Sequence, residues 1–364
     1  MMLDHCIIGD CRDGMRQLIQ GGVRVQTVVT SPPYWGVRDY GVGGQFGLER
    51  SPIRYLARMR SVFRLVWDLL ADDGTLWLNM GDSYAGAPGG YQGRNGQRAS
   101  RTFTARIAHH KRGNGLKPKD LVGMPWLLAL TLRADGWYLR RDIIWSKPNP
   151  MPESAQDRPT TAHEYIFLLS KSERYYYDAE AIREPGSPET HARKSRAFGG
   201  YAPPGQTQHR GILSPRDGLN PKSHGSNGKH KKPVGGWATG TGSHSAIEHA
   251  TPGGDRTKFR VKQNESFTSA ISAEVLPTRN KRSVWTVPSQ PFPEAHFATF
   301  PEKLIEPCIL AGSRTGDTVF DPFMGAGTVA AVATRLGRHW LGCEIKAEYE
   351  AMQKPRVAQL GMAI

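Results

Sequence analysis

The chain has 364 residues, of which 38% are hydrophobic, and a formal net charge of +15 at pH 7. No run approaches the ~20 apolar residues that span a bilayer, and residues 1–5 lack the basic region and apolar core of a secretory signal, so membrane and secreted proteins are disfavoured. The four cysteines form no CxxC pair and are interpreted as reduced thiols, which favours a cytoplasmic protein.

Strand and helix patterns alternate along most of the chain. In the first 180 residues they predict strands at 6–8, 25–30 and 74–79, helices at 11–20, 51–70 and 121–135, and a hairpin-like strand pair at 138–146 and 163–170. The alternation resumes near residue 299, with helices at 301–312 and 326–336 and strands at 318–320 and 339–343. Such alternation predicts an α/β fold with a doubly wound, mainly parallel sheet.

Two basic stretches interrupt this alternation. Residues 86–119 carry eight Lys/Arg and no acid, and residues 185–282 carry sixteen Lys/Arg against six acids. The second stretch is rich in Gly, Pro, Ser and His and has no sustained apolar periodicity. Basic insertions in a near-neutral body favour nucleic acid as the partner. Solvated loops without a partner remain the alternative.

Residues 30–35 read Thr-Ser-Pro-Pro-Tyr-Trp and follow a β-branched run that predicts a buried strand. Two prolines remove two backbone donors and fix φ. A hydroxyl, bare carbonyls and aromatic rings are therefore expected at a strand's carboxyl end, where open α/β sheets bind ligands. Taken alone, the stretch is also compatible with a surface turn.

Residues 320–328 read Phe-Asp-Pro-Phe-Met-Gly-Ala-Gly-Thr and predict a strand end, a Gly-rich turn and a helix start. Gly325 and Gly327 allow close approach of a ligand, and the helix start supplies unpaired N–H donors. The following strand ends at Glu344, in a position to accept hydrogen bonds from a ribose diol. A third glycine of the dinucleotide fingerprint is absent, so a nicotinamide oxidoreductase is disfavoured.

Residues 31–34, Ser-Pro-Pro-Tyr, resemble the catalytic motif of DNA methyltransferases that methylate exocyclic amino groups, and residues 321–328 resemble their S-adenosylmethionine motif. Further segments that resemble this family are residues 9–10, 141–150, 163–167 and 296–304. The order of catalytic loop, insertion and cofactor loop is similar to the permuted β group. The resemblance implies a Rossmann-like methyltransferase sheet with an antiparallel strand pair and a large basic insertion.

This resemblance also implies a division of the chain. Residues 1–184 would form the catalytic half, with the catalytic loop at 30–40 and a basic insertion at 86–119. Residues 185–282 would form a basic target-recognition insertion, partly disordered without DNA, and residues 283–364 the cofactor-binding half.

The family's site residues carry over to this chain position by position. The implied catalytic residues are Ser31, Pro32, Pro33 and Tyr34, where Ser31 and the Pro32 carbonyl accept the amine's N–H bonds and Tyr34 stacks on the base. Trp35 either walls the pocket or packs beneath the loop. The residues implied to hold S-adenosylmethionine are Asp10, Thr299, Phe300, Asp321, Pro322, Phe323, Gly325, Gly327, Thr328 and Glu344.

Two of the implied cofactor contacts are specific. Asp10 would receive the adenine amino group. Asp321 would reach the methionine amino group through water, with a cap on the following turn as its alternative. No metal site is expected.

The implied activity is methyl transfer to the exocyclic amine of a flipped base in double-stranded DNA. Ser31 favours N4 of cytosine, because Ser is more frequent at this motif position in N4-cytosine enzymes and Asp in N6-adenine enzymes. N6-adenine transfer is the alternative within the family. A non-catalytic nucleic-acid-binding protein with this fold, and RNA as the substrate, also stay open.

The resemblance finally implies a cellular setting. It is the cytoplasm of a prokaryote, or a phage-encoded system acting at the nucleoid, without membrane attachment. A cognate restriction endonuclease is an expected partner, and the protein itself is expected to be a monomer or a homodimer.

Overall fold

The computed structural model describes residues 3–37, 39–85, 115–186, 278–290 and 300–358. Its elements, in chain order, are β1 (His5–Ile8), α1 (Cys11–Gln20), β2 (Val25–Thr30), α2 (Pro52–Leu69), β3 (Leu70–Met80), α4 (Met124–Ala134), β4 (Tyr138–Ser146), β5 (His163–Ser170), β6 (Glu184–Pro185), β7 (Thr278–Arg279), β8 (Val284–Thr286), α7 (Glu302–Gly312), β9 (Thr318–Asp321), α8 (Thr328–Arg335), β10 (His339–Glu344), η3 (Ala347–Tyr349) and α9 (Glu350–Ala358). Most of the two basic insertions lies outside the described residues.

The predicted strands and helices are confirmed, with shifted ends at α4, α8 and β3. α4 begins three residues later than predicted, because Gly123 adopts φ 74° and the Asp82 carboxylate accepts hydrogen bonds from the amides of Gly123 and Met124. α8 likewise begins only after Gly327, at φ 80°. β3 extends back to Leu70, which pairs with Val25.

Three elements of the cofactor half were missed by the sequence patterns, namely β8, the three-residue 3-10 helix η3 and α9. β8 has only three residues, too few for a period-2 signal. α9 contains Pro355 and buries only Gln353, so it carries no apolar stripe.

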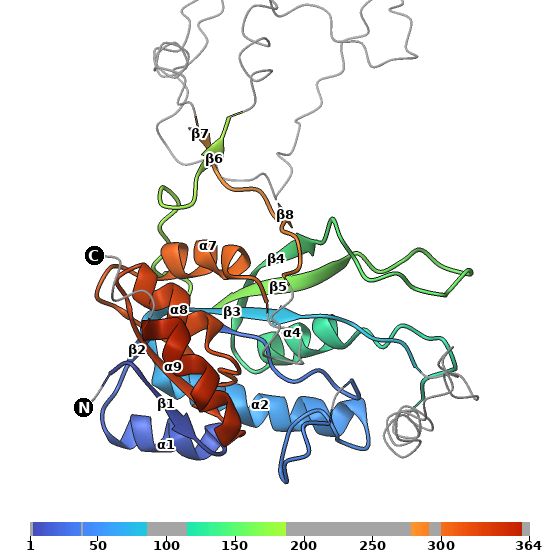
Figure 1. The fold of residues 1–364 in the computed structure, drawn as a ribbon, viewed down its shortest axis with the longest axis horizontal. Helices are drawn as coiled ribbons and strands as arrows, with labels where there is room; N and C mark the ends of the chain where they lie inside the picture. The colour runs from blue at the N-terminus through green and yellow to red at the C-terminus, as the bar shows by residue number, and fades with distance from the viewer. Residues whose placement is uncertain (1–2, 38, 86–114, 187–277, 291–299, 359–364) are drawn as a thin grey trace, which may run out of the picture. The chain divides into compact units, whose positions relative to one another are not determined.

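The central sheet has eight strands in the order β1-β10-β9-β2-β3-β5-β4-β8 (Figure 1). Every neighbouring pair is parallel except those of β5, which runs antiparallel to both β3 and β4. The fold is therefore the mainly parallel, Rossmann-like sheet expected from the sequence, with its antiparallel pair at 138–146 and 163–170.

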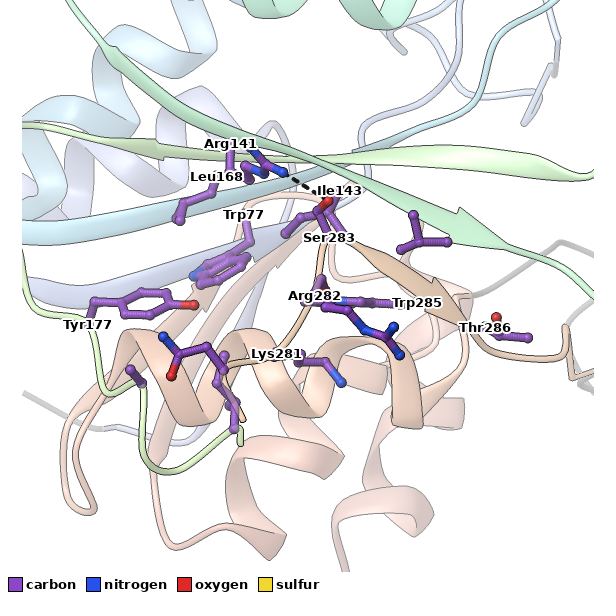
Figure 2. A pocket seen from close by; sticks show the side chains of 14 residues that line it. Trp77, Arg141, Ile143, Leu168, Tyr177, Lys281, Arg282, Ser283, Trp285 and Thr286 are labelled. Atoms are coloured by element: carbon purple, nitrogen blue, oxygen red, sulfur yellow. Dashed lines mark hydrogen bonds between the residues drawn. The ribbon is translucent and has the colours of Figure 1, made fainter. Parts of the chain in front are cut away.

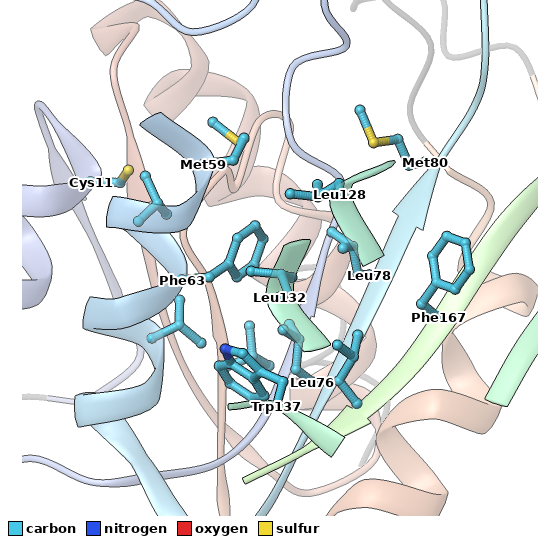
Figure 3. Packing of buried hydrophobic residues seen from close by; sticks show 14 of the residues in the cluster. Cys11, Met59, Phe63, Leu76, Leu78, Met80, Leu128, Leu132, Trp137 and Phe167 are labelled. Carbon is cyan, nitrogen blue, oxygen red and sulfur yellow. The ribbon is translucent and has the colours of Figure 1, made fainter. Parts of the chain in front are cut away.

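Helices cover both faces of this sheet, α1, α2 and α4 on one face and α7 and α8 on the other (Figure 1). Each face of the sheet has its own hydrophobic core cluster, and alternate side chains of β3 pack into the two. Leu76 and Leu78 belong to the first cluster and Trp77 to the second. Figure 3 shows Phe63 and Leu132 meeting Leu76 in the first cluster. Full burial of such a side chain stabilises the fold by about 1.5–3 kcal/mol.

A topological switch point lies between β9 and β2. The chain leaves β9 through α8 toward β10 and leaves β2 through α2 toward β3, so the two connections run in opposite directions across the sheet. Open α/β sheets bind ligands in the crevice at such a point. The carboxyl ends of β9 and β2 are followed by the two loops that the sequence singled out.

The chain divides into two compact units, one of residues 1–185 with 278–364 and the other of residues 186–277. The chain leaves and re-enters the first unit through adjacent strands, because β6 and β7 pair with Glu184 opposite Arg279. Glu184 also forms ion pairs with Arg279 at 3.0 Å and Arg282 at 2.7 Å. Residues 187–277 lie outside the described part of the chain. Of the helices in the described part, none is long and apolar enough to cross a membrane.

Candidate active site

The loop after β2 contains oxygen atoms that can still accept hydrogen bonds. The hydroxyl of Tyr55 donates to the Pro33 carbonyl at 2.9 Å. Within the described residues, no hydrogen bond reaches the carbonyl of Pro32. The Ser31 hydroxyl lies 3.4 Å from the Tyr34 hydroxyl, a long contact that leaves Ser31 with acceptor capacity. Ser31 and Pro32 therefore present two oxygen acceptors at the carboxyl end of β2.

A buried hydrogen bond joins this loop to the loop after β9. Thr30 Oγ1 donates to Asp321 Oδ1 at 2.6 Å, across 291 positions of sequence. The same oxygen accepts from the Phe323 amide at 2.9 Å, so Asp321 caps the turn after β9. Burial raises the pKa of Asp321 to about 7, although both hydrogen bonds lower it. Its water-mediated contact with a methionine amino group remains a prediction.

Glu344, at the end of β10, is 8% exposed and organises the glycine turn. Its two oxygens accept from the amides of Gly325 and Lys346, each at 2.8 Å. The Gly325 amide, expected to face a ligand, is therefore used within the protein. A carboxylate has about four lone-pair positions, so Glu344 keeps capacity for a ribose diol. Burial raises its pKa.

Gly327 also has a packing role that the sequence did not reveal. A Cβ at this position would lie 3.0 Å from Cγ of Gln353 on α9. Gln353 in turn donates from Nε2 to the Gly325 carbonyl at 2.7 Å. Arg356, one turn further on, donates to Thr328 Oγ1 at 3.0 Å. α9 therefore clamps the cofactor loop, and only its folded position identifies these residues.

Asp10 follows β1 and caps α1. Its Oδ1 accepts from the Arg12 amide at 2.9 Å, and the Arg12 guanidinium pairs with both carboxylate oxygens. These hydrogen bonds from Arg12 lower the pKa of Asp10, which keeps it ionised at neutral pH. Arg12 also lies 5.4 Å from the centre of the Phe46 ring, and Phe46 meets Phe323 edge-on at 5.7 Å. Phe46, unnoticed in the sequence, thus connects Asp10 with the cofactor loop.

The remaining predicted residues fall into three groups. Pro322 is buried in the turn, and Phe300 packs against the second core cluster. Thr299 lies outside the described residues. Trp35 is 1% exposed and donates from Nε1 to the Glu49 carbonyl at 2.8 Å, so it packs beneath the loop.

Tyr34 is tied to residues that the sequence did not select. Its hydroxyl donates to Glu164 Oε2 at 2.8 Å, and Lys147 contacts Glu164 Oε1 at 2.5 Å. Because β5 is antiparallel, its first residues reach the same edge of the sheet as the carboxyl ends of the other strands. The only signal in the sequence was that residues 141–150 and 163–167 resemble family segments.

A cavity of about 820 Å³ lies elsewhere on the sheet, against the segment that leads into β8 (Figure 2). Aromatic rings and cationic side chains line it, among them Trp77, Tyr177, Trp285, Arg141, Lys281 and Arg282. It shares no lining residue with the two loops described above. The candidate site is therefore assigned to the two loops at the switch point and not to this cavity.

Comparisons with known proteins agree with this arrangement. A family model of DNA methylases, N6_N4_Mtase, matches residues 25–354. The chain is 38% identical over 341 residues to the type II methyltransferase M.Cfr9I of Citrobacter freundii, covering 94% of this chain and 83% of the relative. It is 37% identical over 351 residues to the type II methyltransferase M.SmaI of Serratia marcescens, covering 96% and 89%.

Solved structures show the same fold at low sequence identity. A proposed DNA modification methylase of Thermus thermophilus, complexed with S-adenosyl-L-methionine, has a TM-score of 0.50 at 20% identity and covers 99% of this chain and 96% of its own. The PvuII DNA methyltransferase, which is cytosine-N4-specific, has a TM-score of 0.52 at 15% identity, covering 97% and 88%.

Proposed function

The chain belongs to the N6/N4 family of DNA methylases, and from this premise we propose that it methylates the exocyclic amino group of a flipped base at a specific DNA sequence, with N4 of cytosine favoured. S-adenosylmethionine is its methyl donor. The observation that carries the proposal is the 2.6 Å hydrogen bond from Thr30 to Asp321. It supports a transfer site because donor and acceptor must meet between the two loops that this bond connects.

The chemistry of the acceptor explains the loop after β2. An exocyclic amine is a poor nucleophile, because its lone pair is delocalised into the ring. The Ser31 hydroxyl and the Pro32 carbonyl accept its two N–H bonds, which favours a tetrahedral nitrogen and accommodates the positive charge that develops. When bound, the cofactor supplies a methyl group activated by a sulfonium. The amine nitrogen would take the methyl group as the methyl–sulfur bond breaks and would then release one proton to solvent, so transfer needs positioning and no covalent intermediate.

The base must leave the duplex to reach these acceptors. Tyr34 offers its ring as the stacking surface, and Pro33, held by Tyr55, fixes the loop behind it. Both positions are thus set by contacts within the protein before DNA binds.

The cofactor contacts are proposed for the residues around the glycine turn. Glu344 accepts hydrogen bonds from the ribose diol, and Asp10 accepts from the adenine amino group. Asp321 and residues 299–300 contact the methionine end of the cofactor. The turn between the two ends of the cofactor site includes Pro322, Phe323, Gly325, Gly327 and Thr328. The two carboxylates fit this role because both are held by backbone amides at the ends of their strands, Glu344 with free lone pairs and Asp10 kept ionised by Arg12.

Ser31 is the residue on which the choice of N4 of cytosine depends. The test is to incubate the protein with labelled S-adenosylmethionine and duplex DNA, digest the DNA to nucleosides and identify the methylated base. We expect N4-methylcytosine. N6-methyladenine would overturn the choice of base, and label in neither nucleoside would overturn the proposed activity.

The relatives also suggest a biological setting, since both are type II methyltransferases. We propose that a restriction endonuclease with the same recognition sequence accompanies this protein. An extract of the source organism should then cleave unmodified DNA and spare DNA premethylated by the protein. Equal cleavage of both DNAs would contradict the pairing.

A further inference from the structure

The carboxylate of Glu164 accepts hydrogen bonds from three side chains beside the catalytic loop. It accepts from the Tyr34 hydroxyl at 2.8 Å, from Lys147 Nζ at 2.5 Å and from Asn79 Nδ2 at 3.3 Å. The side chains of Glu164 and Lys147 are only 17% and 20% exposed. Partial burial strengthens hydrogen bonds to a charged group, because water competes less for it.

Rigid elements hold this carboxylate. Asn79 on β3 also donates to the Tyr165 carbonyl at 3.1 Å, which ties it to β5. The ammonium of Lys147 lies 4.3 Å from the centre of the Trp145 ring at the end of β4. Three strands thus fix Glu164, whereas Tyr34 belongs to a loop.

The backbone at Gly81 also packs against the contact between Tyr34 and Glu164. A Cβ on Gly81, just after β3, would lie 3.0 Å from Cε2 of Tyr34 and 3.1 Å from Cδ of Glu164. A side chain at this position would therefore push Tyr34 or Glu164 aside by a few tenths of an ångström. Burial raises the pKa of Tyr34 well above its usual range, with the nearby Glu164 charge adding to it, so the phenol keeps its proton and donates.

We propose that Glu164 is a positioning residue for methyl transfer, which rests on the function proposed above: its carboxylate holds the Tyr34 hydroxyl and thereby fixes the ring on which the target base stacks. Glu164 acts through Tyr34, whose oxygen lies 3.4 Å from Ser31 Oγ. Loss of the anchor leaves the base free to turn relative to the Ser31 and Pro32 acceptors. A misplacement of this kind lowers the rate of transfer without weakening cofactor binding.

A double-mutant cycle tests this dependence. We would compare the parent protein with Tyr34→Phe, Glu164→Ala and the double variant, measuring single-turnover methyl incorporation into duplex DNA. Each single change should lower the rate about tenfold, and the double variant should lose little more than either. The dissociation constant for S-adenosylmethionine should stay within about twofold of the parent. Losses that multiply to about a hundredfold would overturn the proposal, since Glu164 would then act on the base directly.

Conservative variants separate positioning from folding. Glu164→Gln keeps an acceptor oxygen for Tyr34 and should recover most of the rate, so its rate alone tests the proposal where Glu164→Ala fails to fold. Asp135→Asn is the matched control, because Asp135 is also a buried carboxylate, paired with Arg60 and Arg64 at the opposite edge of the sheet. It should leave the rate unchanged.

The outcomes for Glu164 are distinct from those for the proposed function. A folded Glu164→Gln protein as slow as Glu164→Ala, or a loss of cofactor affinity equal to the loss of rate, would contradict the positioning role. The nucleoside product of the parent protein tests the proposed function instead. A parent that methylates adenine leaves the rate ratios, and hence the test of Glu164, intact.

Discussion

At the scale of single residues, the candidate site is defined by which oxygen atoms the fold leaves open. The Pro33 carbonyl is occupied by Tyr55, whereas Ser31 and Pro32 keep acceptor capacity. In the short prolyl loop, the Pro33 carbonyl is therefore used within the fold, whereas the Pro32 carbonyl is the one proposed to accept from the amine. Of the two acceptors Ser31 and Pro32, only the Ser31 hydroxyl belongs to a side chain, so only this oxygen can be removed by a substitution.

Ser31→Ala should lower the rate of methyl transfer by about a hundredfold or more, because it removes an acceptor that is needed where charge develops. Cofactor binding should be unaffected, since the proposed role of this hydroxyl is to accept from the amine and not to bind the cofactor. Single-turnover rates and calorimetric titration with S-adenosylmethionine measure the two effects. Ser61→Ala, on the exposed face of α2, is the control. Parent-rate transfer by Ser31→Ala would remove Ser31 from the mechanism.

Asp321 should make stability depend on pH. Burial raises its pKa from 3.8 to about 7, so the native state binds this proton more tightly than the unfolded chain does. The stabilisation is therefore complete below about pH 4 and is lost as pH rises through about 7. Asp321→Asn cannot ionise and should flatten this slope by at most about 1.4 kcal/mol per pH unit.

Urea unfolding across this range of pH measures that slope. The exposed Asp13→Asn variant, which removes a carboxylate outside the core, should behave like the parent protein. An unchanged slope in Asp321→Asn would show that Asp321 titrates normally in the native state.

At the scale of elements, α9 determines the shape of the cofactor loop although it follows that loop in sequence. Gln353 is 3% exposed and holds the Gly325 carbonyl, and Arg356 holds Thr328 while pairing with Glu302 at 2.9 Å. Since the one buried residue of this helix is the polar Gln353, these polar contacts, together with Val357 against the second core cluster, retain it. Its contribution to the site is the conformation of the glycine turn.

Gln353→Ala should weaken S-adenosylmethionine binding about tenfold, because it leaves a buried carbonyl without its donor and loosens the turn. Calorimetric titration measures the change. Lys354→Ala, next in sequence and exposed, provides the control. Equal affinities of parent and Gln353→Ala would mean that the turn keeps its shape without α9.

At the scale of the whole molecule, the sheet and the basic insertion are separate parts of one chain. Residues 187–277 contain thirteen Lys/Arg and six acids, and the strands that flank them, β6 and β7, lie next to each other. A short Gly-Ser linker can therefore replace the segment without moving its ends.

This deletion should keep S-adenosylmethionine binding, lose methylation of the specific sequence and reduce the salt dependence of DNA affinity, because fewer phosphates are neutralised. Calorimetry, nucleoside analysis and DNA binding over a salt series measure the three effects. A deletion protein that methylates the same sequence at the parent rate would place target recognition elsewhere in the chain.

The sequence by itself determined most elements of the fold and the two loops of the candidate site. Periodicity and Gly or Pro punctuation are local, so β2, α2 and β10, the prolyl loop at 31–34 and the glycine turn at 325–327 could be predicted within a few residues. The assignment of Glu344 to the end of a strand was local in the same sense.

Only the tertiary structure decided which residues act together. Thr30 and Asp321 are 291 positions apart, and Tyr34 and Glu164 are 130 apart. No local pattern predicts such contacts, because they follow from strand order and from the reversed direction of β5. The hydrogen bond from Gln353 to the Gly325 carbonyl likewise arises only when α9 packs against the glycine turn.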